Sequence, residues 1–262
     1  MRRAAESSGG VLTLNIGNTT ISATRILRGR IANRWSAASN AQSLPLFRAW
    51  VAGLSPRPGR GAMACVVPRF RSKFARACRD VLSTVPLELS PAHPLGVTLA
   101  YPHPETLGSD RLAILAGASS RIAPPFILMD AGTALTFNVV TSRGFIGGVI
   151  APGPAFFLNY LADRTAQLPS LSPAKHRLPA VGRGTEESMR IGARAGFEGM
   201  MRGILEHLRR DPELAGAQIA VTGGGADRVR RALAHERVVL FRDLVHWGLA
   251  DALRRLPPNT PG

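Results

Sequence analysis

The sequence predicts an α/β fold made of two similar halves, each with a mixed β-sheet flanked by helices, and with a cleft between the halves. A repeated pattern is the first observation. VLTLNIGNTTISATRI, from Val11, and FILMDAGTALTFNVV, from Phe126, each contain an apolar run, a small polar turn and a second apolar run. The second observation is that both halves continue in about the same order, β-β-β-α-β-α-β-α. We expect residues 11–117 and 118–256 to form one domain each, with tails at 1–10 and 257–262.

The first half contains the elements of one such domain. Its hairpin, from Val11 to Ile26, is followed by a third strand at RIANRW and a helix at LPLFRAWVAGL. GRGAMACVVP predicts a strand that ends at Pro68, and RFRSKFARACRDVLSTV predicts a helix because its apolar residues recur at helical spacing. A short strand, PLELS, and a proline-rich loop lead to a helix at RLAILAGASSRI.

The second half repeats this order with a longer helix. GFIGGVIAPG predicts a third strand, and PAFFLNYLADRTAQL predicts a helix that Pro152 and Pro154 open. The pattern EESMRIGARAGFEGMMRGILEHLRR predicts a long helix that could break near Gly196 or Gly199. AQIAVTGGGADRVRRALAH predicts a strand, a glycine turn and a helix, and RVVLFRDLVHWGLADALRRL predicts a strand and a helix. Four apolar residues are expected in the core or against a partner chain: Phe156, Phe157, Leu158 and Leu161.

The chain is strongly basic, with a formal net charge of +16 and a pI of about 11.6. Such a charge raises the possibility of nucleic-acid binding. However, the arginines are spread along the chain, and their densest clusters, 69–79 and 228–237, fall in predicted surface helices. No basic stretch is interleaved with aromatic residues that could stack on bases. We therefore attribute the charge to compositional bias, with a field that could attract anionic substrates, and nucleic-acid binding stays an alternative supported by charge alone.

The cysteine count and the apolar runs indicate a cytoplasmic protein. Cys65 and Cys78 are too few for a disulfide framework, and their spacing is not that of a zinc site. No apolar run approaches the ~18 residues of a membrane helix, so we expect no membrane partner. The first ten residues hold two arginines without an apolar segment after them, which does not fit a secretory signal.

Both hairpin turns and a third glycine-rich turn are candidates for holding phosphate. Turns of Gly, Asn and Thr expose backbone N–H groups and hydroxyls that bind anionic oxygens. Asp130, at the end of a strand, could hold a cation that accompanies phosphate. TGGGAD, from Thr222, brings bare backbone to a point that suits a phosphate or an adenosine. One such hairpin alone is most often only a turn, and the third motif could be a flexible strand–helix connection.

Two further motifs have both a structural and a functional interpretation. In YPHPETLGSDRLA, Asp110 could accept a hydroxyl proton, with Arg111 beside it to bind an anionic substrate. The alternative is that Asp110 or Ser109 caps the helix that begins there. In GRGTEESMRIGA, the alternative to a binding role is that Thr185 is a helix N-cap, with two glutamates near the positive end of the helix dipole.

Together, these motifs resemble the type III pantothenate kinases of the acetate and sugar kinase, heat-shock protein 70 and actin superfamily. The matching pieces are NIGNTT, YPHPETLGSDR, DAGTALT, GGVIAPG, TAQLP, GTEES and TGGGAD, in the family's order from about Leu12 to Leu253. The resemblance implies duplicated actin-like, ribonuclease H-like domains. It also implies transfer of the γ-phosphoryl group of ATP to the primary hydroxyl of pantothenate, which gives 4′-phosphopantothenate in the first step toward coenzyme A.

The resemblance further implies roles for individual residues. Asp110 would be the general base, and Asp130 would bind a monovalent cation, K⁺ or NH₄⁺. Thr185 would touch pantothenate across a homodimer interface, and a divalent ion, usually Mg²⁺, would accompany ATP. The implied pantothenate-binding residues are Tyr101, Gly108, Ser109, Asp110, Arg111 and Thr185. The implied ATP-binding residues are Asn15, Ile16, Gly17, Asn18, Thr19, Thr20, Ile21, Ser22 and Thr133.

The chain departs from the family pattern at three positions. The family usually has Asp where this chain has Asn15 and again where it has Asn138, and it often has a charged residue where Ser22 stands. An amide keeps the shape of a carboxylate without its charge, and losing one charge–metal interaction could cost ~10²–10³ in rate. The alternative to an active kinase is therefore a catalytically weakened homologue that acts as a ligand-binding accessory or regulatory protein.

Overall fold

The computed structural model describes residues 9–82, 84–174 and 177–257, so most of the two predicted tails lies outside the described residues. The chain forms two compact units. Unit 1 consists of Met1–Ala123 together with Asp243–Gly262, and unit 2 is Pro124–Arg242. The predicted boundary between residues 117 and 118 therefore lies inside a helix of unit 1, and the last helix belongs to unit 1 rather than to the C-terminal half.

Unit 1 is built on a five-stranded mixed sheet with the strand order β3-β2-β1-β4-β5. β1 pairs with β2 and β2 with β3 in antiparallel fashion, whereas β4 runs parallel to both β1 and β5. The predicted strands are all present. Their bounds are β1 Val11–Ile16, β2 Thr20–Leu27, β3 Arg30–Ala38, β4 Arg60–Cys65 and β5 Leu87–Glu88.

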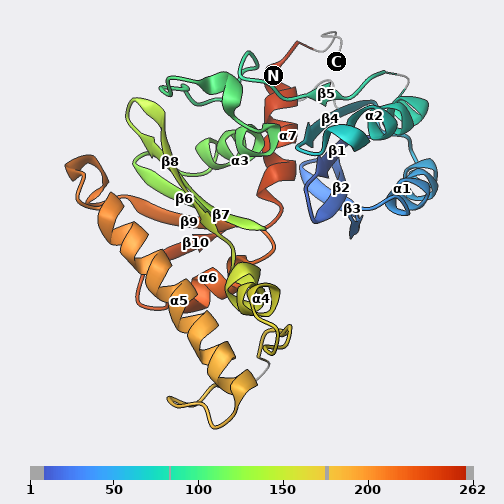
Figure 1. Ribbon diagram of the computed structural model, residues 1–262. Helices are drawn as coiled ribbons and strands as arrows, with labels where there is room; N and C mark the ends of the chain where they lie inside the picture. The colour runs from blue at the N-terminus through green and yellow to red at the C-terminus, as the bar shows by residue number, and fades with distance from the viewer. Residues whose placement is uncertain (1–8, 83, 175–176, 258–262) are drawn as a thin grey trace. The chain divides into compact units, whose positions relative to one another are not determined.

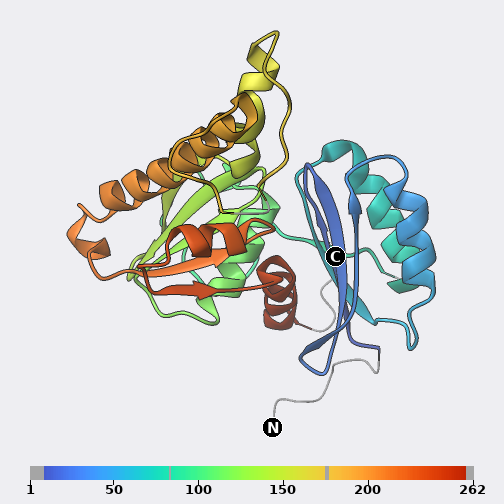
Figure 2. The same cartoon turned by 90° about the horizontal axis from the view of Figure 1, so that it is seen from below.

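Helices cover both faces of this sheet. α1 (Ser43–Ala52) and α2 (Pro68–Leu82) lie on one side of the strands and α7 (Leu244–Arg255) lies on the other, as both views show (Figures 1 and 2). Alternation along β1 explains the division. Leu12, Leu14 and Ile16 pack into the core beneath α1 and α2, while Thr13 points to the α7 side.

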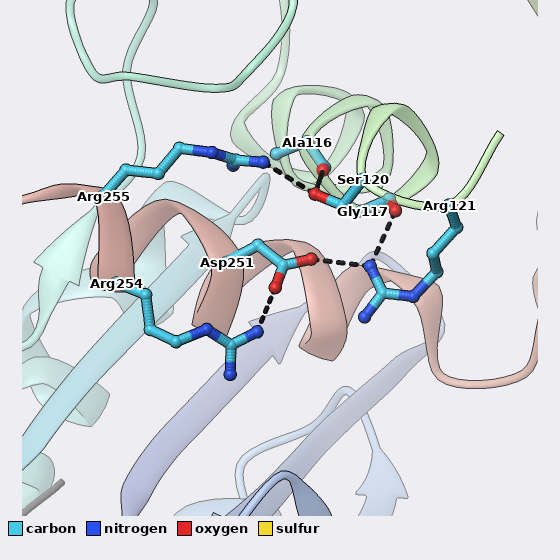
Figure 3. Close-up of polar contacts among 7 residues, drawn as sticks. All are labelled: Ala116, Gly117, Ser120, Arg121, Asp251, Arg254 and Arg255. Atoms are coloured by element: carbon cyan, nitrogen blue, oxygen red, sulfur yellow. Dashed lines mark hydrogen bonds and ion pairs between the residues drawn. The ribbon is translucent and has the colours of Figure 1, made fainter. Parts of the chain in front are cut away.

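α7 joins unit 1 through α3 (Ser109–Ser119), although 124 residues separate the two helices. The helices approach closely at Gly117 and Gly248, where an added Cβ on Gly248 would lie 1.7 Å from the Ala113 carbonyl oxygen. Figure 3 shows the polar contacts along the same interface: the buried Asp251 carboxylate accepts from Arg121 and from Arg254. Glycine contacts and a buried ion pair therefore fix the helix to unit 1.

Unit 2 repeats the sheet of unit 1. Its order is β10-β9-β6-β7-β8, with β6–β7 and β7–β8 antiparallel and β6–β9 and β9–β10 parallel. This is the topology of unit 1 with β6 in the place of β1, so the predicted duplication is confirmed. The bounds are β6 Phe126–Ala131, β7 Ala134–Thr141, β8 Gly144–Pro152, β9 Gln218–Thr222 and β10 Val238–Leu240.

The helices α5 and α6 pack on one face of the second sheet, and α4 packs on α5. Phe197, Met201 and Val229 share a core cluster with Ile127 and Val221. Their bounds are α4 Pro154–Arg164, α5 Thr185–Leu208 and α6 Ala226–Ala232. α5 is continuous over 24 residues (orange in Figure 1), and the break considered near Gly196 or Gly199 does not occur.

Small differences from the sequence expectations have local causes. Gly9 and Gly10, predicted as part of a tail, are buried, and their carbonyl groups accept from Arg25 and from the Gly59 N–H. Pro68 begins α2 rather than ending a strand, because proline fits the first turn of a helix, where its missing N–H is not needed. Pro152 ends β8, so only Pro154 opens α4.

Candidate functional site

The first hairpin has a polar residue, Asn15, next to the end of β1. Four residues, 17–20, separate the last paired residues, Ile16 and Ile21, and the Gly17 N–H donates to the Thr20 carbonyl. Asn18, Thr19 and Thr20 are exposed. Asn15 Oδ1 is buried and accepts no hydrogen bond from any residue in the described part of the chain. The turn therefore offers side-chain polar groups to a ligand, next to a buried oxygen without a protein donor.

A polar network lies on the same face of β1 and β2, below this turn. Asn15 pairs with Ser22 in the sheet register, and Thr13 pairs with Thr24. His246 of α7 reaches both pairs: its Nδ1 lies 2.9 Å from Thr13 Oγ1 and its Nε2 lies 3.0 Å from Ser22 Oγ. Burial lowers the pKa of His246 to about 4, so the ring is neutral at pH 7. Ser22 is thus held by a neutral imidazole.

The start of α3 lies at the same edge of the sheet as the turn. β1 and β4 are parallel, with Ile16 opposite Cys65, so both carboxyl ends meet at this edge. Ser109, the first residue of α3, accepts the Cys65 N–H at 2.8 Å through its hydroxyl. The structure thereby brings Ser109–Arg111 to the strand ends that carry the 15–22 turn.

Asp110 is half-buried in the first turn of α3 and does not cap the helix. The N-cap residue is Gly108, which has no side chain to cap the helix, so the interpretation of Ser109 or Asp110 as the cap was wrong. Asp110 Oδ1 instead accepts the N–H of Arg111 at 2.7 Å. Burial raises the pKa of Asp110, and the Arg111 N–H and its positive charge oppose the rise. An added Cβ on Gly108 would lie 2.7 Å from Asp110 Oδ1, so the carboxylate needs glycine at this position.

Tyr101 belongs to the stiff loop that precedes this helix. It is half-buried and lies before the short 3₁₀ helix Pro104–Thr106. The loop belongs to unit 1, as do Ser109–Arg111 and the first hairpin. Unit 1 therefore contains all of the predicted pantothenate-binding and ATP-binding residues except Thr185 and Thr133.

The second hairpin presents a carboxylate at the equivalent strand end. Asp130 pairs with Thr136 on β7 and with Thr222 on β9. Gly223 has a φ of +91°, and an added Cβ would lie 2.4 Å from Asp130 Oδ1. Asn138 is buried, and its Nδ2 donates to the Leu128 carbonyl at 3.1 Å and to Thr136 Oγ1 at 3.0 Å. The glycine turn TGGGAD therefore folds directly onto the carboxylate.

Backbone hydrogen bonds tie the neighbouring loops to this hairpin. The Gly153 N–H donates to the Thr133 carbonyl at 3.1 Å, and the Gly225 N–H donates to the Ala131 carbonyl at 2.8 Å. An added Cβ on Gly153 would lie 2.3 Å from the Thr133 carbonyl oxygen. Asp130, Thr133 and the glycine turn thus form one cluster within unit 2.

Thr185 lies at the start of α5 and is exposed. The N-cap residue is Gly184, so the interpretation of Thr185 as N-cap was wrong by one position. Glu187 accepts the Arg183 N–H at 2.8 Å, which satisfies a backbone donor before the helix. The Thr185 hydroxyl is therefore not committed to a cap.

Two adjoining cavities in unit 2 were not anticipated from the sequence. One has a volume of about 740 Å³ and the other about 360 Å³, and both include residues of α4 and α6. The smaller cavity borders Gly224 and Gly225 of the glycine turn. Arg228 and Arg231 line both. The signal in the sequence was the cluster of arginines at 228–237, which we had attributed to composition.

Comparison with known proteins identifies the family. The model of the type III pantothenate kinases matches residues 11–207. A type III pantothenate kinase of Thermomicrobium roseum is 30% identical over 257 residues, which cover 94% of this chain and 97% of the relative. The chain belongs to the type III pantothenate kinase family. A pantothenate kinase of Methylacidiphilum infernorum is 37% identical over 143 residues, but the match covers only 54% of this chain and about half, 52%, of that relative.

Solved structures support the actin-like fold of this family member. The activator of 2-hydroxyisocaproyl-CoA dehydratase from Clostridium difficile, with bound ADPNP, has a TM-score of 0.52 at 11% identity and covers 93% of this chain and 92% of that chain. A ROK family glucokinase of Streptomyces griseus, with glucose and AMPPNP, has a TM-score of 0.50 at 14% identity, with coverage of 92% and 97%. At such identities the likeness shows the fold alone.

Family membership sets the broad chemistry. Type III pantothenate kinases are phosphotransferases of coenzyme A biosynthesis that use ATP with a divalent metal ion. Within the described residues, no three His, Cys, Asp or Glu side chains gather into a metal-binding group. No helix of the described chain is long and apolar enough to cross a membrane.

Proposed function

We propose that this chain transfers the γ-phosphoryl group of ATP to the primary hydroxyl of pantothenate. The observation that carries the proposal is the half-buried carboxylate of Asp110, held at the sheet edge that also bears the 15–22 turn. Phosphoryl transfer requires positioning and charge neutralisation more than covalent chemistry, and these two groups supply a proton acceptor beside a phosphate-binding turn. Membership of the family supports the choice of pantothenate.

In this mechanism the turn from Asn15 to Ser22 holds the ATP phosphates through the polar groups of Asn18, Thr19 and Thr20. Asp110 accepts the proton of the substrate hydroxyl as the new P–O bond forms. Its raised pKa makes it a better proton acceptor than an exposed aspartate. Arg111 binds the carboxylate of pantothenate, while Tyr101, Gly108 and Ser109 shape the substrate pocket.

A divalent ion fits the first hairpin through Asn15. Mg²⁺ usually keeps several waters and is held by phosphate oxygens and one or two protein oxygens. The buried and unpartnered Asn15 Oδ1 is such an oxygen, at the strand end that leads into the turn. This amide oxygen is uncharged, so it would bind the ion without neutralising it. The ion would neutralise part of the negative charge of the phosphates.

Asp130 is the proposed ligand of a monovalent cation, K⁺ or NH₄⁺, with Thr133 in contact with ATP. The carboxylate at a strand end, closed in by Gly223, supports this assignment. Activity should fall when K⁺ and NH₄⁺ are replaced by Na⁺ or by a bulky organic cation. Equal rates in all four buffers would contradict the cation site and leave the kinase assignment untouched.

Release of ADP with and without pantothenate, in potassium buffer, tests the function. Asp110→Asn should lower turnover by ~10²-fold or more, because a general base typically contributes at least this much. Asp80→Asn is the control, since Asp80 is an exposed carboxylate of α2 in the same unit. If Asp110→Asn keeps more than about a tenth of wild-type turnover, Asp110 is not the general base.

A weakened homologue that binds nucleotide or pantothenate as an accessory protein is the second candidate function. Asn15 favours it, because the amide lacks the charge of the family's usual aspartate. Calorimetric binding of ATP or pantothenate without turnover would support this candidate. Restoration of turnover by Asn15→Asp would then identify the missing charge as its cause.

We further propose a cytoplasmic homodimer in which Thr185 contacts the pantothenate bound by a second copy of the chain. Phe156, Tyr160 and Leu161 of α4 support it, because these large apolar side chains are 46%, 44% and 39% exposed. Phe157 and Leu158, by contrast, pack against the core of unit 2. Light scattering of a monomer at micromolar concentration, in a preparation that turns over pantothenate, would exclude this arrangement.

A further inference from the structure

A histidine of α7 lies beneath the turn of the first hairpin. His246, in the first turn of α7, is 2% exposed, and both of its ring nitrogens contact hydroxyl groups of the hairpin. Nδ1 lies 2.9 Å from Thr13 Oγ1, and Nε2 lies 3.0 Å from Ser22 Oγ. None of the motifs that carried the family resemblance contains this histidine, so only the tertiary structure connects it to the turn.

The directions of these hydrogen bonds follow from the threonine at the far end of the network. Thr24 Oγ1 is buried, lies 2.7 Å from Thr13 Oγ1, and has no other hydrogen-bonding partner in the part of the chain that the structure describes. A buried hydroxyl that donates to nothing is unfavourable, so Thr24 donates its proton to Thr13 Oγ1. The Thr13 proton then has two possible acceptors, His246 Nδ1 at 2.9 Å and the Thr24 carbonyl oxygen at 3.4 Å. Only the shorter contact is a good hydrogen-bond distance, so Thr13 donates to Nδ1.

This direction fixes the position of the imidazole proton. Burial lowers the pKa of His246 to about 4, so the ring is neutral and has one N–H group. Because Nδ1 accepts the proton of Thr13, that N–H group is on Nε2, and it donates to Ser22 Oγ. Ser22 therefore keeps its own hydroxyl proton for an acceptor outside the network. Ser22 is half-buried, and it lies in β2 just after the 17–20 turn.

The second hairpin holds the equivalent hydroxyl in a similar way. Thr136 lies opposite Asp130, as Ser22 lies opposite Asn15. Thr136 Oγ1 accepts from the Nδ2 of the buried Asn138 at 3.0 Å, so this hydroxyl also keeps its own proton for another acceptor. A buried N–H donor thus orients the equivalent hydroxyl in both hairpins, although the donors come from different elements.

We propose that His246 is a positioning residue for nucleotide binding, whose Nε2–H orients Ser22 so that the Ser22 hydroxyl donates to a phosphate oxygen of ATP. This inference rests on the proposed function, which places the ATP phosphates on the turn from Asn15 to Ser22. An ionised phosphate oxygen only accepts hydrogen bonds, so it suits a hydroxyl whose proton is not used by the protein. At a position where the family often has a charged residue, this chain thereby has a neutral donor that a buried ring holds in place.

Two substitutions of His246 separate its two contacts in the full-length chain. His246→Gln places an amide nitrogen near the position of Nε2 and keeps a donor for Ser22. His246→Asn reaches only the position of Nδ1 and leaves Ser22 without that donor. The dissociation constant of ATP, measured by calorimetry with Mg²⁺, should rise about tenfold in His246→Asn and less than about threefold in His246→Gln. The KM for ATP should rise in the same way, while the KM for pantothenate should not change. Equal changes of ATP affinity in the two variants would overturn the inference.

Ser22→Ala tests the same contact without changing α7. It removes the hydroxyl and should weaken ATP binding about tenfold, as His246→Asn does. Adding His246→Asn to Ser22→Ala should weaken binding by less than about twofold more, because the histidine acts through the serine. Wild-type affinity of Ser22→Ala, or effects of the two substitutions that multiply, would overturn the inference.

Nitrogen-15 NMR of the imidazole signals reads the tautomer directly, with His246→Gln to assign them. A proton on Nε2 is expected, and a proton on Nδ1 would reverse the network and overturn the inference. Binding is measured without turnover, so a chain that shows these affinity changes but does not phosphorylate pantothenate would overturn only the proposed function. A wild-type chain that binds no ATP would overturn both.

Discussion

The two hairpins have the same backbone plan and different chemistry at the equivalent position. Asn15 and Asp130 are each the next-to-last residue of the first strand of their hairpin, opposite Ser22 and Thr136. The first turn places four residues, 17–20, between its last paired residues, and the second places three, 132–134. The amide oxygen of Asn15 has no donor among the described residues, while Gly223 leaves just enough room for the Asp130 carboxylate.

The residues that support the two strand ends differ as well. Below Asn15, the pair Thr13 and Thr24 is bridged to Ser22 by His246, which comes from a helix distant in the sequence. Below Asp130, the equivalent pair is Leu128 and Asn138, and the Asn138 amide bonds within its own hairpin. A duplicated sheet therefore preserves the position of the strand end, while the residue type at that position makes one end neutral and the other acidic.

The largest expected effect comes from crowding the carboxylate of the second hairpin. Gly223→Ala places a Cβ 2.4 Å from Asp130 Oδ1 at a residue with a φ of +91°, so both the carboxylate and the backbone must move. Turnover should fall by ~10²-fold or more, because displaced electrostatic groups in a phosphoryl site cost this much. Gly224→Ala is the matched control, since an added Cβ there has no heavy atom within 4 Å. Similar turnover in the two variants would remove Asp130 from the site.

The second prediction places a carboxylate at position 138. Asn138→Asp puts an acceptor where the structure needs a donor, opposite the Leu128 carbonyl in a fully buried place. The free energy of unfolding should fall by about 3 kcal/mol at pH 7, as for a buried charge without a partner.

Urea unfolding measures this change, with Asn138→Ala as the control that removes the hydrogen bonds without adding a charge. The loss in Asn138→Asp should shrink at acidic pH, because protonation removes the buried charge. An aspartate variant as stable as wild type at pH 7 would mean that the second hairpin accepts either residue.

The third prediction concerns the histidine below the first hairpin. Its folded pKa, about 4, lies below the ordinary value of 6.5, so the unfolded chain binds the proton more readily. The contribution of His246 to the free energy of unfolding is fully present above pH 6.5. It is lost as the pH falls toward 4, by up to roughly 3 kcal/mol. Burial of the uncharged His246 ring therefore makes the folded protein less stable at acidic pH.

The measurement is the difference in free energy of unfolding between wild type and His246→Leu, followed from pH 7 to pH 4. As the pH falls, wild type should lose free energy of unfolding faster than His246→Leu does. His207→Leu, which removes an exposed histidine of α5, should run parallel to wild type over this range. A His246→Leu curve parallel to wild type would show that His246 does not titrate with folding.

The last prediction concerns the metal dependence at Asn15. Asn15→Asp makes the first strand end charged like the second, so the magnesium concentration for half-maximal rate should fall about tenfold and the rate should rise. Parallel magnesium titrations of wild type, Asn15→Asp and the exposed control Asn33→Asp measure it. Unchanged rate and metal dependence in Asn15→Asp would show that position 15 does not act on the metal.

Local patterns were sufficient to predict most elements and the duplication. Alternating apolar residues around Gly17 and Gly132 determine both hairpins, because a strand with one buried face fixes its own register. The apolar spacing from Phe70 to Val81 likewise predicted α2. Proline and glycine positions were less decisive. Pro68 could end a strand or begin a helix, and Gly196 and Gly199 lie within a continuous α5.

The sequence by itself thus determined the two sheets, the polar turns at their strand ends and the family motifs, since these depend on neighbours a few residues apart. Only the tertiary structure determined which residues distant in the sequence contact the strands below these turns. His246 lies 233 residues from Thr13, and it reaches β1 because α7 packs on α3 of unit 1. The tertiary structure likewise determines that Arg194 and Arg231 line one cavity, because they belong to two different helices, α5 and α6. Contacts of this kind depend on which apolar faces pack together over the whole chain, and no local spacing records that choice.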